Sequence, residues 1–404
     1  MVIVELLIDI QVYQGLILKK KNEFVMSGAV MRQLMKLYPG GVNKTRNFED
    51  IYRKLSLENL KEGEEVFLFR SGGIGDVMFI LPLIKYLKKN YKVKIKMGTS
   101  PMYSSILENN PYIDTVVQMP FKVKELESSD HHLMFEGVIE DTPAKAQILH
   151  AVDLFLEEGG VNFKEISSEE KIPYLYLKNS ETKKIEKEIK ELRIDHAAKK
   201  IGFQIESSSP IRTFPLDKMI VVMKKLIEKG YVAFVFGGKR QERTGEYLRE
   251  IFLEEKNFVN LITGDRSLRD SIVYTSQMDI FIAPDSSFIH IAGGLGVSVV
   301  GLYGCFPSLL RMRYYKNAIG IDCGVGCAPS FIHGHSPCSK GFPSPCFSVI
   351  SVDDILNAVN HLLGKKKVQL MYPTFNEFKK GELIKSPFST LSISEKEKSK
   401  EEDV

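Results

Sequence analysis

The sequence predicts an α/β chain with two Rossmann-like halves that face a cleft. Strand-like apolar runs alternate with stretches of helical spacing over residues 66–119 and again over residues 201–303. Strands that alternate with helices form parallel sheets, and two such series imply two halves. Ligands of such sheets bind at the carboxyl ends of the strands. The residues that follow each strand are therefore the candidates for function.

Composition narrows the classes of protein. A chain of 404 residues with 44% hydrophobic residues is long enough for two domains and their cores. A net charge of +4 is too small to indicate nucleic acid as the main partner. The sequence has no apolar run of about 18 residues, as a membrane span requires. Its first residues carry Glu5 and Asp9 and lack the basic start of a signal peptide. We therefore expect a cytoplasmic protein, at most peripheral to the inner face of the membrane.

Residues 1–62 are expected to form a small accessory extension of mixed structure. The apolar pattern predicts strands at 2–10 and 14–18 and a helix within 25–38. A cluster of Pro39, Gly40 and Gly41 then breaks the pattern.

The N-terminal half is expected at 63–197. Alternating patterns predict its strands at 66–69, 93–97, 115–119 and 134–139. Its helices are expected from Asp76 onward and at 101–108, 144–158 and 181–193, the last leading into a linker.

The C-terminal half is expected at 198–365. Its predicted strands lie at 201–205, 231–236, 259–262, 280–283 and 298–303. Its predicted helices lie at 216–228, 241–254, 267–276, 286–295 and 352–363. An irregular Cys-rich insertion is expected at 305–350, and residues 366–404 are expected to be a flexible charged tail.

A glycine turn follows the first strand of the first half. Gly72, Gly73 and Gly75 allow positive φ angles and close approach of a ligand, and Asp76 lies where a helix begins. A carboxylate at this place is either a general base or a common helix N-cap. The turn lacks the Lys-Ser/Thr of a P-loop, and neither half has a complete GxGxxG, so a P-loop NTPase and a nicotinamide dehydrogenase are disfavoured.

A second strand–turn–helix pattern lies at 280–304. Asp285, Ser286 and Ser287 open the predicted helix, and His290 lies one turn further along. Hydroxyls, free N–H groups and an imidazole at a helix start suit a diphosphate. The alternative is that Asp285 and Ser286 only cap the helix while His290 is a packed polar residue.

Two further loops at carboxyl strand ends carry suitable groups. Arg212 follows the first strand of the second half and can neutralise a phosphate, and Glu242 follows the second and can accept hydrogen bonds from ribose hydroxyls. On such loops the alternative is a solvated side chain.

These residues resemble the motifs of one enzyme family. Residues 70–87, RSGGIGDVMFILPLIKYL, match its R-x-x-x-x-G-D-x-x-x-x-x-P-x-x-x-x-L pattern. Residues 285–304, DSSFIHIAGGLGVSVVGLYG, match its D-S-G-x-x-H-x-A-x-x-x-G-x-P-x-x-x-L-F/Y-G pattern, and RTFP at 212–215 resembles its basic-x-aromatic-Pro element. Over roughly residues 64–363 the chain resembles glycosyltransferase family 9, typified by ADP-heptose:lipopolysaccharide heptosyltransferases. The departures are Ser287 for Gly, Ser298 for Pro and Phe214 for Trp.

The resemblance implies the GT-B fold and an inverting sugar transfer. It implies that Asp76 deprotonates the acceptor hydroxyl and that Arg212 stabilises the leaving diphosphate. Asp285, Ser286, Ser287 and His290 would bind the donor diphosphate, and Glu242 its ribose. The glycine loop would lie on the acceptor side. Such transfer needs no metal, because cationic and dipolar groups stabilise the developing charge.

The implied partners are a nucleotide-sugar and an acceptor that is a glycan, a lipopolysaccharide or a protein. The sugar would be a heptose and the nucleotide ADP. Two alternatives share the architecture: a nucleotide-sugar 2-epimerase, which isomerises its sugar without an acceptor, and a non-catalytic nucleotide-sugar binding protein.

Four cysteines cluster late in the chain. Cys323, Cys327, Cys338 and Cys346 have the spacing C-x3-C-x10-C-x7-C. Four thiols this close are typical of a structural zinc or iron site. Reduced thiols in an ordinary loop and disulfides are the alternatives, and in each case the expected role is structural.

Overall fold

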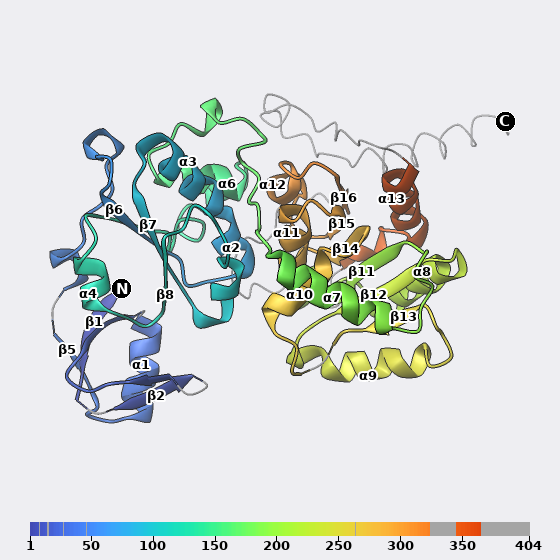
Figure 1. Cartoon of the computed structure of the whole chain (residues 1–404), viewed down its shortest axis with the longest axis horizontal. Coiled ribbons are helices and arrows are strands. Elements are labelled where there is room, and N and C mark those ends of the chain that lie inside the picture. Colours follow the sequence, from blue (N-terminus) through green and yellow to red (C-terminus); the bar gives the residue numbers. More distant parts are fainter. Residues whose placement is uncertain are drawn as a thin grey trace. The chain divides into compact units, whose positions relative to one another are not determined.

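The computed structural model describes residues 1–7, 9–13, 16–26, 28–45, 47–262, 264–323 and 345–364. The chain forms two compact units (Figure 1). Unit 1 comprises Met1–Val138 and Phe155–Glu165, and unit 2 comprises Ile139–Leu154 and the chain from Ile166 onward. Unit 2 thus begins before the predicted second series of strands. It includes Tyr174, Tyr176 and α7 (Asn179–Glu191). No helix among the described residues is long and apolar enough to cross a membrane.

The central sheet of unit 1 is parallel, as its alternating pattern predicts. Its strands are β6 (Glu65–Phe69), β7 (Lys94–Thr99), β8 (Thr115–Gln118) and β10 (His131–Met134), in the order β10-β6-β7-β8. The strand expected at 134–139 was wrong, because β10 ends at Met134. His132 disrupts the apolar pattern of this strand. The imidazole is fully buried and hydrogen-bonded on both ring nitrogens, so a polar residue takes a core position.

The N-terminal residues form an antiparallel sheet that joins the core of unit 1. Its order is β5-β1-β4-β9, with strands β1 (Val2–Leu6), β4 (Glu23–Met26), β5 (Val42–Lys44) and β9 (Phe121–Lys122). The hairpin of β2 (Ile10–Tyr13) and β3 (Leu16–Leu18) forms a separate two-stranded sheet, and helix α1 (Gly28–Leu37) contacts β1 and β5. Buried side chains of this sheet pack with Phe67, Phe69 and Phe121 in one cluster. The extension is therefore continuous with the first parallel sheet.

Two helices that the sequence predicts as continuous are each divided into two shorter ones. After β6, α2 (Ile74–Phe79) and α3 (Leu81–Tyr91) replace one long helix, with Pro82 at the start of the second. The helix expected at 144–158 is divided into α5 (Pro143–Ala146) and α6 (Ala151–Glu158). His150 explains the break, because its Nδ1 accepts a hydrogen bond of 3.1 Å from the Val152 N–H and so caps α6.

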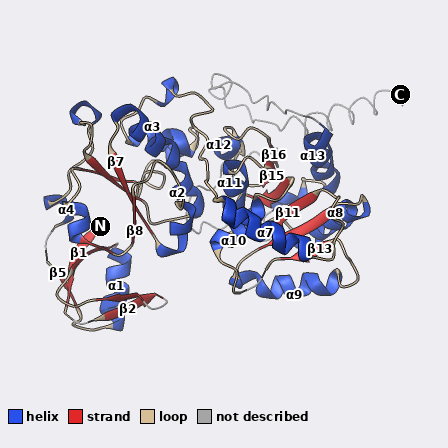
Figure 2. Ribbon diagram, in the orientation of Figure 1, coloured by secondary structure: helices blue, strands red, loops and turns tan. Residues whose placement is uncertain are grey.

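Unit 2 contains a six-stranded parallel sheet (Figure 2). Its order is β13-β12-β11-β14-β15-β16. This is the doubly wound order, in which strands are added on one side of β11 up to β13 and then on its other side from β14 onward. The strands are β11 (Lys200–Gln204), β12 (Val232–Phe236), β13 (Phe258–Asn260), β14 (Ile280–Pro284), β15 (Ser298–Tyr303) and β16 (Ala318–Asp322). The α/β prediction with parallel sheets is confirmed.

Helices cover both faces of this sheet. Helices α8 (Leu216–Glu228) and α13 (Val352–Gly364) pack together on one face, against alternate strand residues such as Ile201, Ile282 and Leu302. Helix α11 (Ser287–Gly294) contacts β14 and β15, and α10 (Leu268–Thr275) lies between α11 and α7. Helix α9 (Glu242–Ile251) leads into β13. Both strand faces are apolar because both are covered.

The region 305–350 is more regular than expected. Helix α12 (Leu309–Met312) and strand β16 lie within it, and β16 is the last strand of the sheet. Its five residues, AIGID, are too short and too close to the Cys-rich stretch to give a clear strand pattern. Cys327, Cys338 and the predicted tail 366–404 lie outside the described residues.

Candidate active site

The glycine turn of unit 1 follows β6, the strand at which the order of successive strands in the sheet reverses. The chain runs outward from β6 to β7 and β8 and then returns to the other side of β6 as β10, so the loops after β6 and β10 are neighbours. Hydrogen bonds join these loops: Arg70 donates to the Phe135 carbonyl at 2.7 Å, and the Ser71 N–H donates to Glu136 at 2.5 Å. Ligands of open α/β sheets bind at such a reversal point.

Asp76 is held in this turn by a buried arginine. The Asp76 carboxylate lies 2.8 Å from Arg70 Nη2, and the side chains are only 14% and 3% exposed. The N-cap of α2 is Gly73, with φ +47°, and no side chain caps the helix. Asp76 lies in the first turn of α2 with Gly75 before it, while Gly72 precedes the cap. The N-cap alternative for Asp76 is therefore wrong, and its position comes from Arg70.

The second set of predicted residues lies at the reversal point of unit 2, between β11 and β14. The loop after β11 and the loop after β14 are joined by side chains. Ser207 Oγ donates to the Asp285 carbonyl at 2.8 Å, and Ser286 Oγ lies 2.5 Å from Gln204 Oε1. The hydroxyl of Ser286, the N-cap residue of α11, is thus directed to β11 instead of the helix N–H groups.

Arg212 comes from the loop after β11 and bridges to the loop after β14. Its Nη1 lies 3.4 Å from Asp285 Oδ2, and its Nη2 donates to Ser208 Oγ at 2.8 Å. Arg212 Nε is buried and has no hydrogen-bond partner among the described residues. A partly exposed cation with a long ion pair is suited to bind an added anion.

Asp285 and Ser287 complete the start of α11. Asp285 is 7% exposed, whereas Ser287, the first residue of the helix, is partly exposed. A helix start with a hydroxyl and free N–H groups attracts phosphate.

His290 lies beneath this turn instead of at its surface. It is 4% exposed, and its Nδ1 is 2.9 Å from the Tyr315 hydroxyl. Burial lowers the pKa of His290 to about 3, so the imidazole is neutral at ordinary pH. A neutral, buried His290 supports the turn through hydrogen bonding and contributes no positive charge.

Glu242 begins α9, after β12, and is partly buried. A Cβ built on Gly264 would lie 2.2 Å from Glu242 Oε1, so Gly264 leaves the room that this carboxylate occupies. Its neighbour Thr244 donates to Glu206 at 2.8 Å, which connects α9 to the loop after β11. Three loops at one edge of the sheet thus carry Arg212, Glu242 and Asp285.

The sequence did not single out several residues that hold these groups in place. They are Arg70, Glu136, Gln204 and Ser207. Arg70 was detectable, because it ends an apolar strand and lies six residues before Asp76. The others depend on which strands become neighbours, which a single chain pattern does not contain.

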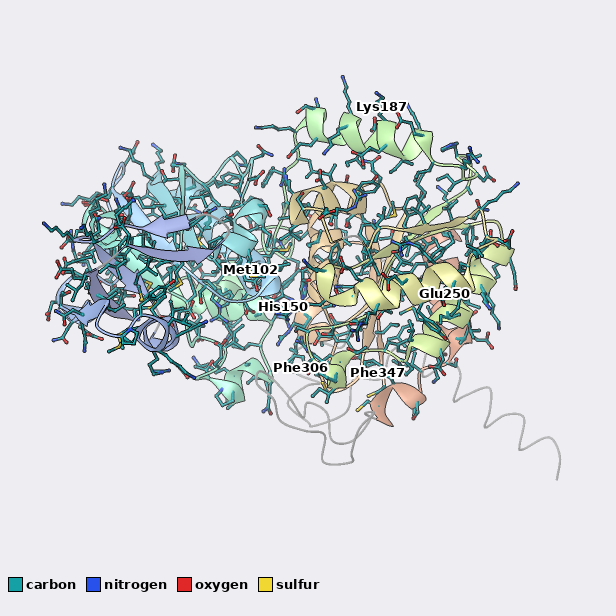
Figure 3. The ribbon with its side chains drawn as sticks, turned by 90° about the horizontal axis from the view of Figure 1, so that it is seen from below. Met102, His150, Lys187, Glu250, Phe306 and Phe347 are labelled. Carbon is teal, nitrogen blue, oxygen red and sulfur yellow. The ribbon has the colours of Figure 1, made fainter. Side chains whose placement is uncertain are left out.

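Two of the four clustered cysteines, Cys323 and Cys346, are described by the structure and lie beside the same glycine. Cys323 Sγ is 2.7 Å from the Gly304 carbonyl, and a Cβ built on Gly304 would lie 3.1 Å from Cys346 Cβ. Phe347, labelled in Figure 3, packs edge-on against Phe214 beside the Arg212 loop. Soft thiolates close together suit zinc or iron, and the described residues contain no group of three or more metal-binding side chains.

Known proteins resemble this chain over most of its length. Lipopolysaccharide heptosyltransferase 1 of Campylobacter coli is 21% identical, over 74% of this chain and 99% of that protein. The structure of Escherichia coli ADP-heptose lipopolysaccharide heptosyltransferase II has a TM-score of 0.58 at 16% identity, over 74% of this chain and 98% of that one. A family 9 glycosyltransferase of Veillonella parvula has a TM-score of 0.60 at 18% identity, over 75% and 98%.

A further similar structure is that of an iron-containing enzyme. It is the dodecameric iron-containing glycosyltransferase TibC of enterotoxigenic Escherichia coli, with a TM-score of 0.53 at 14% identity, over 76% of this chain and 80% of that one. At these identities the structural likenesses establish the fold, and the predicted GT-B architecture is confirmed.

The family assignment comes from the sequence model. The model described as glycosyltransferase family 9 (heptosyltransferase) matches residues 83–336, which is more than half of the chain. The match includes Arg212, Glu242 and the α11 turn and begins after Asp76. The chain belongs to glycosyltransferase family 9, the heptosyltransferase family, and is a glycosyltransferase enzyme.

Proposed function

We propose that this enzyme transfers a heptose, with inversion, from ADP-heptose to a hydroxyl group of a lipopolysaccharide, glycan or protein acceptor. The observation that carries the proposal is the bridge from Arg212 to Asp285 across the reversal point of unit 2. It places a partly exposed guanidinium, with a buried unused N–H, where doubly wound sheets bind phosphates. Membership of the heptosyltransferase family and the similarity to ADP-heptose lipopolysaccharide heptosyltransferase II support the choice of sugar and nucleotide.

The proposed reaction assigns one role to each group. The Asp76 carboxylate takes the proton of the acceptor hydroxyl, whose oxygen attacks the anomeric carbon of the sugar. The bond from that carbon to the phosphate oxygen breaks, and the diphosphate leaves with the electron pair. Arg212 and the N–H groups at the start of α11 stabilise its charge. Glu242 accepts hydrogen bonds from the ribose, and no cofactor takes part in the transfer.

The donor side of the proposal is tested by comparing ligands with and without phosphates. We expect ADP-heptose and ADP to bind the wild type, and Arg212→Ala to weaken ADP by roughly 10-fold or more while leaving adenosine unchanged. Arg193→Ala, an exposed arginine of the same unit, is the matched control. Equal losses for ADP and adenosine would show that Arg212 is structural.

The catalytic base is tested with Asp76→Asn, which keeps the shape and an oxygen acceptor for Arg70. We expect transfer to fall about 10²–10⁴-fold while ADP binding is retained. Asp50→Asn, on an exposed position of unit 1, is the control. A variant within threefold of the wild type would remove Asp76 from the mechanism. Release of ADP without any acceptor, together with an isomerised sugar, would favour an epimerase.

A structural zinc or iron at Cys323, Cys327, Cys338 and Cys346 is part of the proposal. It is supported by the proximity of Cys323 and Cys346 to Gly304 and by the thiolate chemistry of the set. Metal analysis of protein purified without a histidine tag should give about one ion per chain. Four free thiols in the native protein without metal would exclude it.

A further inference from the structure

Tyr303 carries a buried hydroxyl with no hydrogen-bond partner among the described residues. It ends β15 and its side chain is fully buried. Burying a hydroxyl without a partner costs roughly 1–3 kcal/mol of folding free energy. Phenylalanine would avoid this cost, so the presence of tyrosine here calls for an explanation.

Strand register makes Tyr303 and Asp285 neighbours in the sheet. Pro284 is paired with Leu302, and the Asp285 N–H donates to the Leu302 carbonyl at 3.1 Å, so Asp285 and Tyr303 are the next neighbours in the ladder. In a parallel ladder neighbouring residues point to the same face of the sheet. Here that face is the one covered by α11, because the opposite face holds Ile282 and Leu302 against α8 and α13.

The carboxylate on the other side of Tyr303 already has its hydrogen bonds. Asp322 is paired with Tyr303 in the register of β15 and β16. Its two oxygens accept from the Ser308 N–H at 2.7 Å and from Ser308 Oγ at 2.6 Å. Asp285, in contrast, is paired with Arg212, and a bound diphosphate would change that pairing.

That change follows from the proposed function, on which this inference rests. In the structure Arg212 is shared between Asp285, at a long 3.4 Å, and Ser208. A diphosphate competes for the same guanidinium. When Arg212 turns to the diphosphate, Asp285, which is 7% exposed, loses a counter-charge, and an uncompensated buried charge is strongly unfavourable.

We propose that Tyr303 is a positioning residue: when a diphosphate draws Arg212 away, the Tyr303 hydroxyl donates a hydrogen bond to Asp285 and keeps that carboxylate in place. The unpartnered Tyr303 hydroxyl is then a reserve donor. Burial, followed by the charge of Asp285, raises the pKa of Tyr303 well above its ordinary value, so the hydroxyl keeps the proton that it must donate.

The test is a double-mutant cycle of Tyr303→Phe and Arg212→Ala read by thermal unfolding without ligand. In the wild-type background Tyr303→Phe should leave Tm unchanged or raise it, because an unused hydroxyl is removed. In the Arg212→Ala background the hydroxyl is already engaged, so the same change should lower Tm by about 2–4 °C. A change of the same size in both backgrounds, zero included, overturns the proposal. Arg212→Gln serves as a second background should Arg212→Ala fold poorly.

A binding arm separates this inference from the proposed function. Tyr303→Phe should raise the Kd for ADP about 5–10-fold in the wild-type background and leave it unchanged with Arg212→Ala. Tyr274→Phe removes a hydroxyl that bonds Glu188 at 2.7 Å, and it should lower Tm without affecting ADP. If the wild type fails to bind ADP, the proposed donor is wrong while the unfolding cycle still decides on Tyr303.

Discussion

Asp322 shows at the scale of one residue how burial sets a charge. It ends β16, and two hydrogen bonds from Ser308 hold its oxygens. A Cβ built on Gly320 would lie 2.1 Å from Ser308 Oγ, so only glycine allows Ser308 to approach. Burial raises the pKa of Asp322 to about 6, although both hydrogen bonds act in the other direction.

This pKa predicts a pH-dependent contribution to stability. The folded carboxyl binds its proton more tightly than the unfolded one, whose pKa is about 3.9, so its contribution is complete at low pH and declines as the pH rises toward 6. Relative to Asp322→Asn, the wild type should therefore lose roughly 2–3 kcal/mol of unfolding free energy between about pH 4 and pH 7. Urea unfolding at several pH values measures this. A pH-independent difference between the two proteins would contradict it.

At the scale of an element, the β6–α2 turn depends on one glycine and not on its neighbour. Gly73 has φ +47°, and a Cβ built there would lie 2.9 Å from Asp76 Oδ2. Gly72 has no atom outside its neighbours closer than 3.8 Å. The turn therefore demands glycine at 73 for its backbone and for the approach of the carboxylate.

We expect Gly73→Ala to lower the unfolding free energy by about 1–2 kcal/mol, because the alanine is strained and displaces Asp76. Transfer should fall at least 10-fold through the misplaced carboxylate. Gly72→Ala is the matched control and should change neither property by much. The pair is measured by urea unfolding and by the transfer assay; similar behaviour of both variants would refute the distinct role of Gly73.

At the scale of the whole molecule, the chain passes between the two units more than once. A buried cluster of charged residues holds segment 139–154 against the rest of unit 2. Asp153, fully buried, pairs with Lys171 at 2.8 Å and with Arg313, and accepts a hydrogen bond from Tyr314 at 2.7 Å. These residues come from segments of unit 2 that are separated in sequence by residues 155–165 of unit 1. The cluster thus joins segment 139–154 to the body of unit 2.

Removing the charge of Asp153 should be costly because two cations remain. We expect Asp153→Asn to lower the unfolding free energy of the full-length enzyme by about 3–5 kcal/mol. The exposed pair of Lys316 and Glu169 is the control: Lys316→Met should leave the unfolding free energy nearly unchanged, because solvent screens the pair. Both are measured by denaturant unfolding. Equal, small effects would mean that the buried cluster does not hold the segment.

The sequence by itself determined the repeating order of strands and helices and the positions of the main polar groups. Helix α8 and strand β15 have the bounds that their apolar spacing predicts. Local periodicity suffices for them because both are buried along a regular stripe or face. The turns that carry Asp76 and Asp285 were also found locally, since glycines, caps and charges at strand ends are sequence features.

Only the tertiary structure decided which residues meet. Strand β10 was misplaced because the polar His132 takes a buried position, where it accepts a hydrogen bond from Arg53, 79 residues earlier in the chain, and bonds the Leu126 carbonyl. Strand β16 was missed because its stability comes from pairing with β15. The pairing of Arg212 with Asp285, and the row from Asp285 through Tyr303 to Asp322, exist because β11, β14, β15 and β16 become neighbours. Sheet order is fixed by long-range packing, and a local pattern contains no information about it.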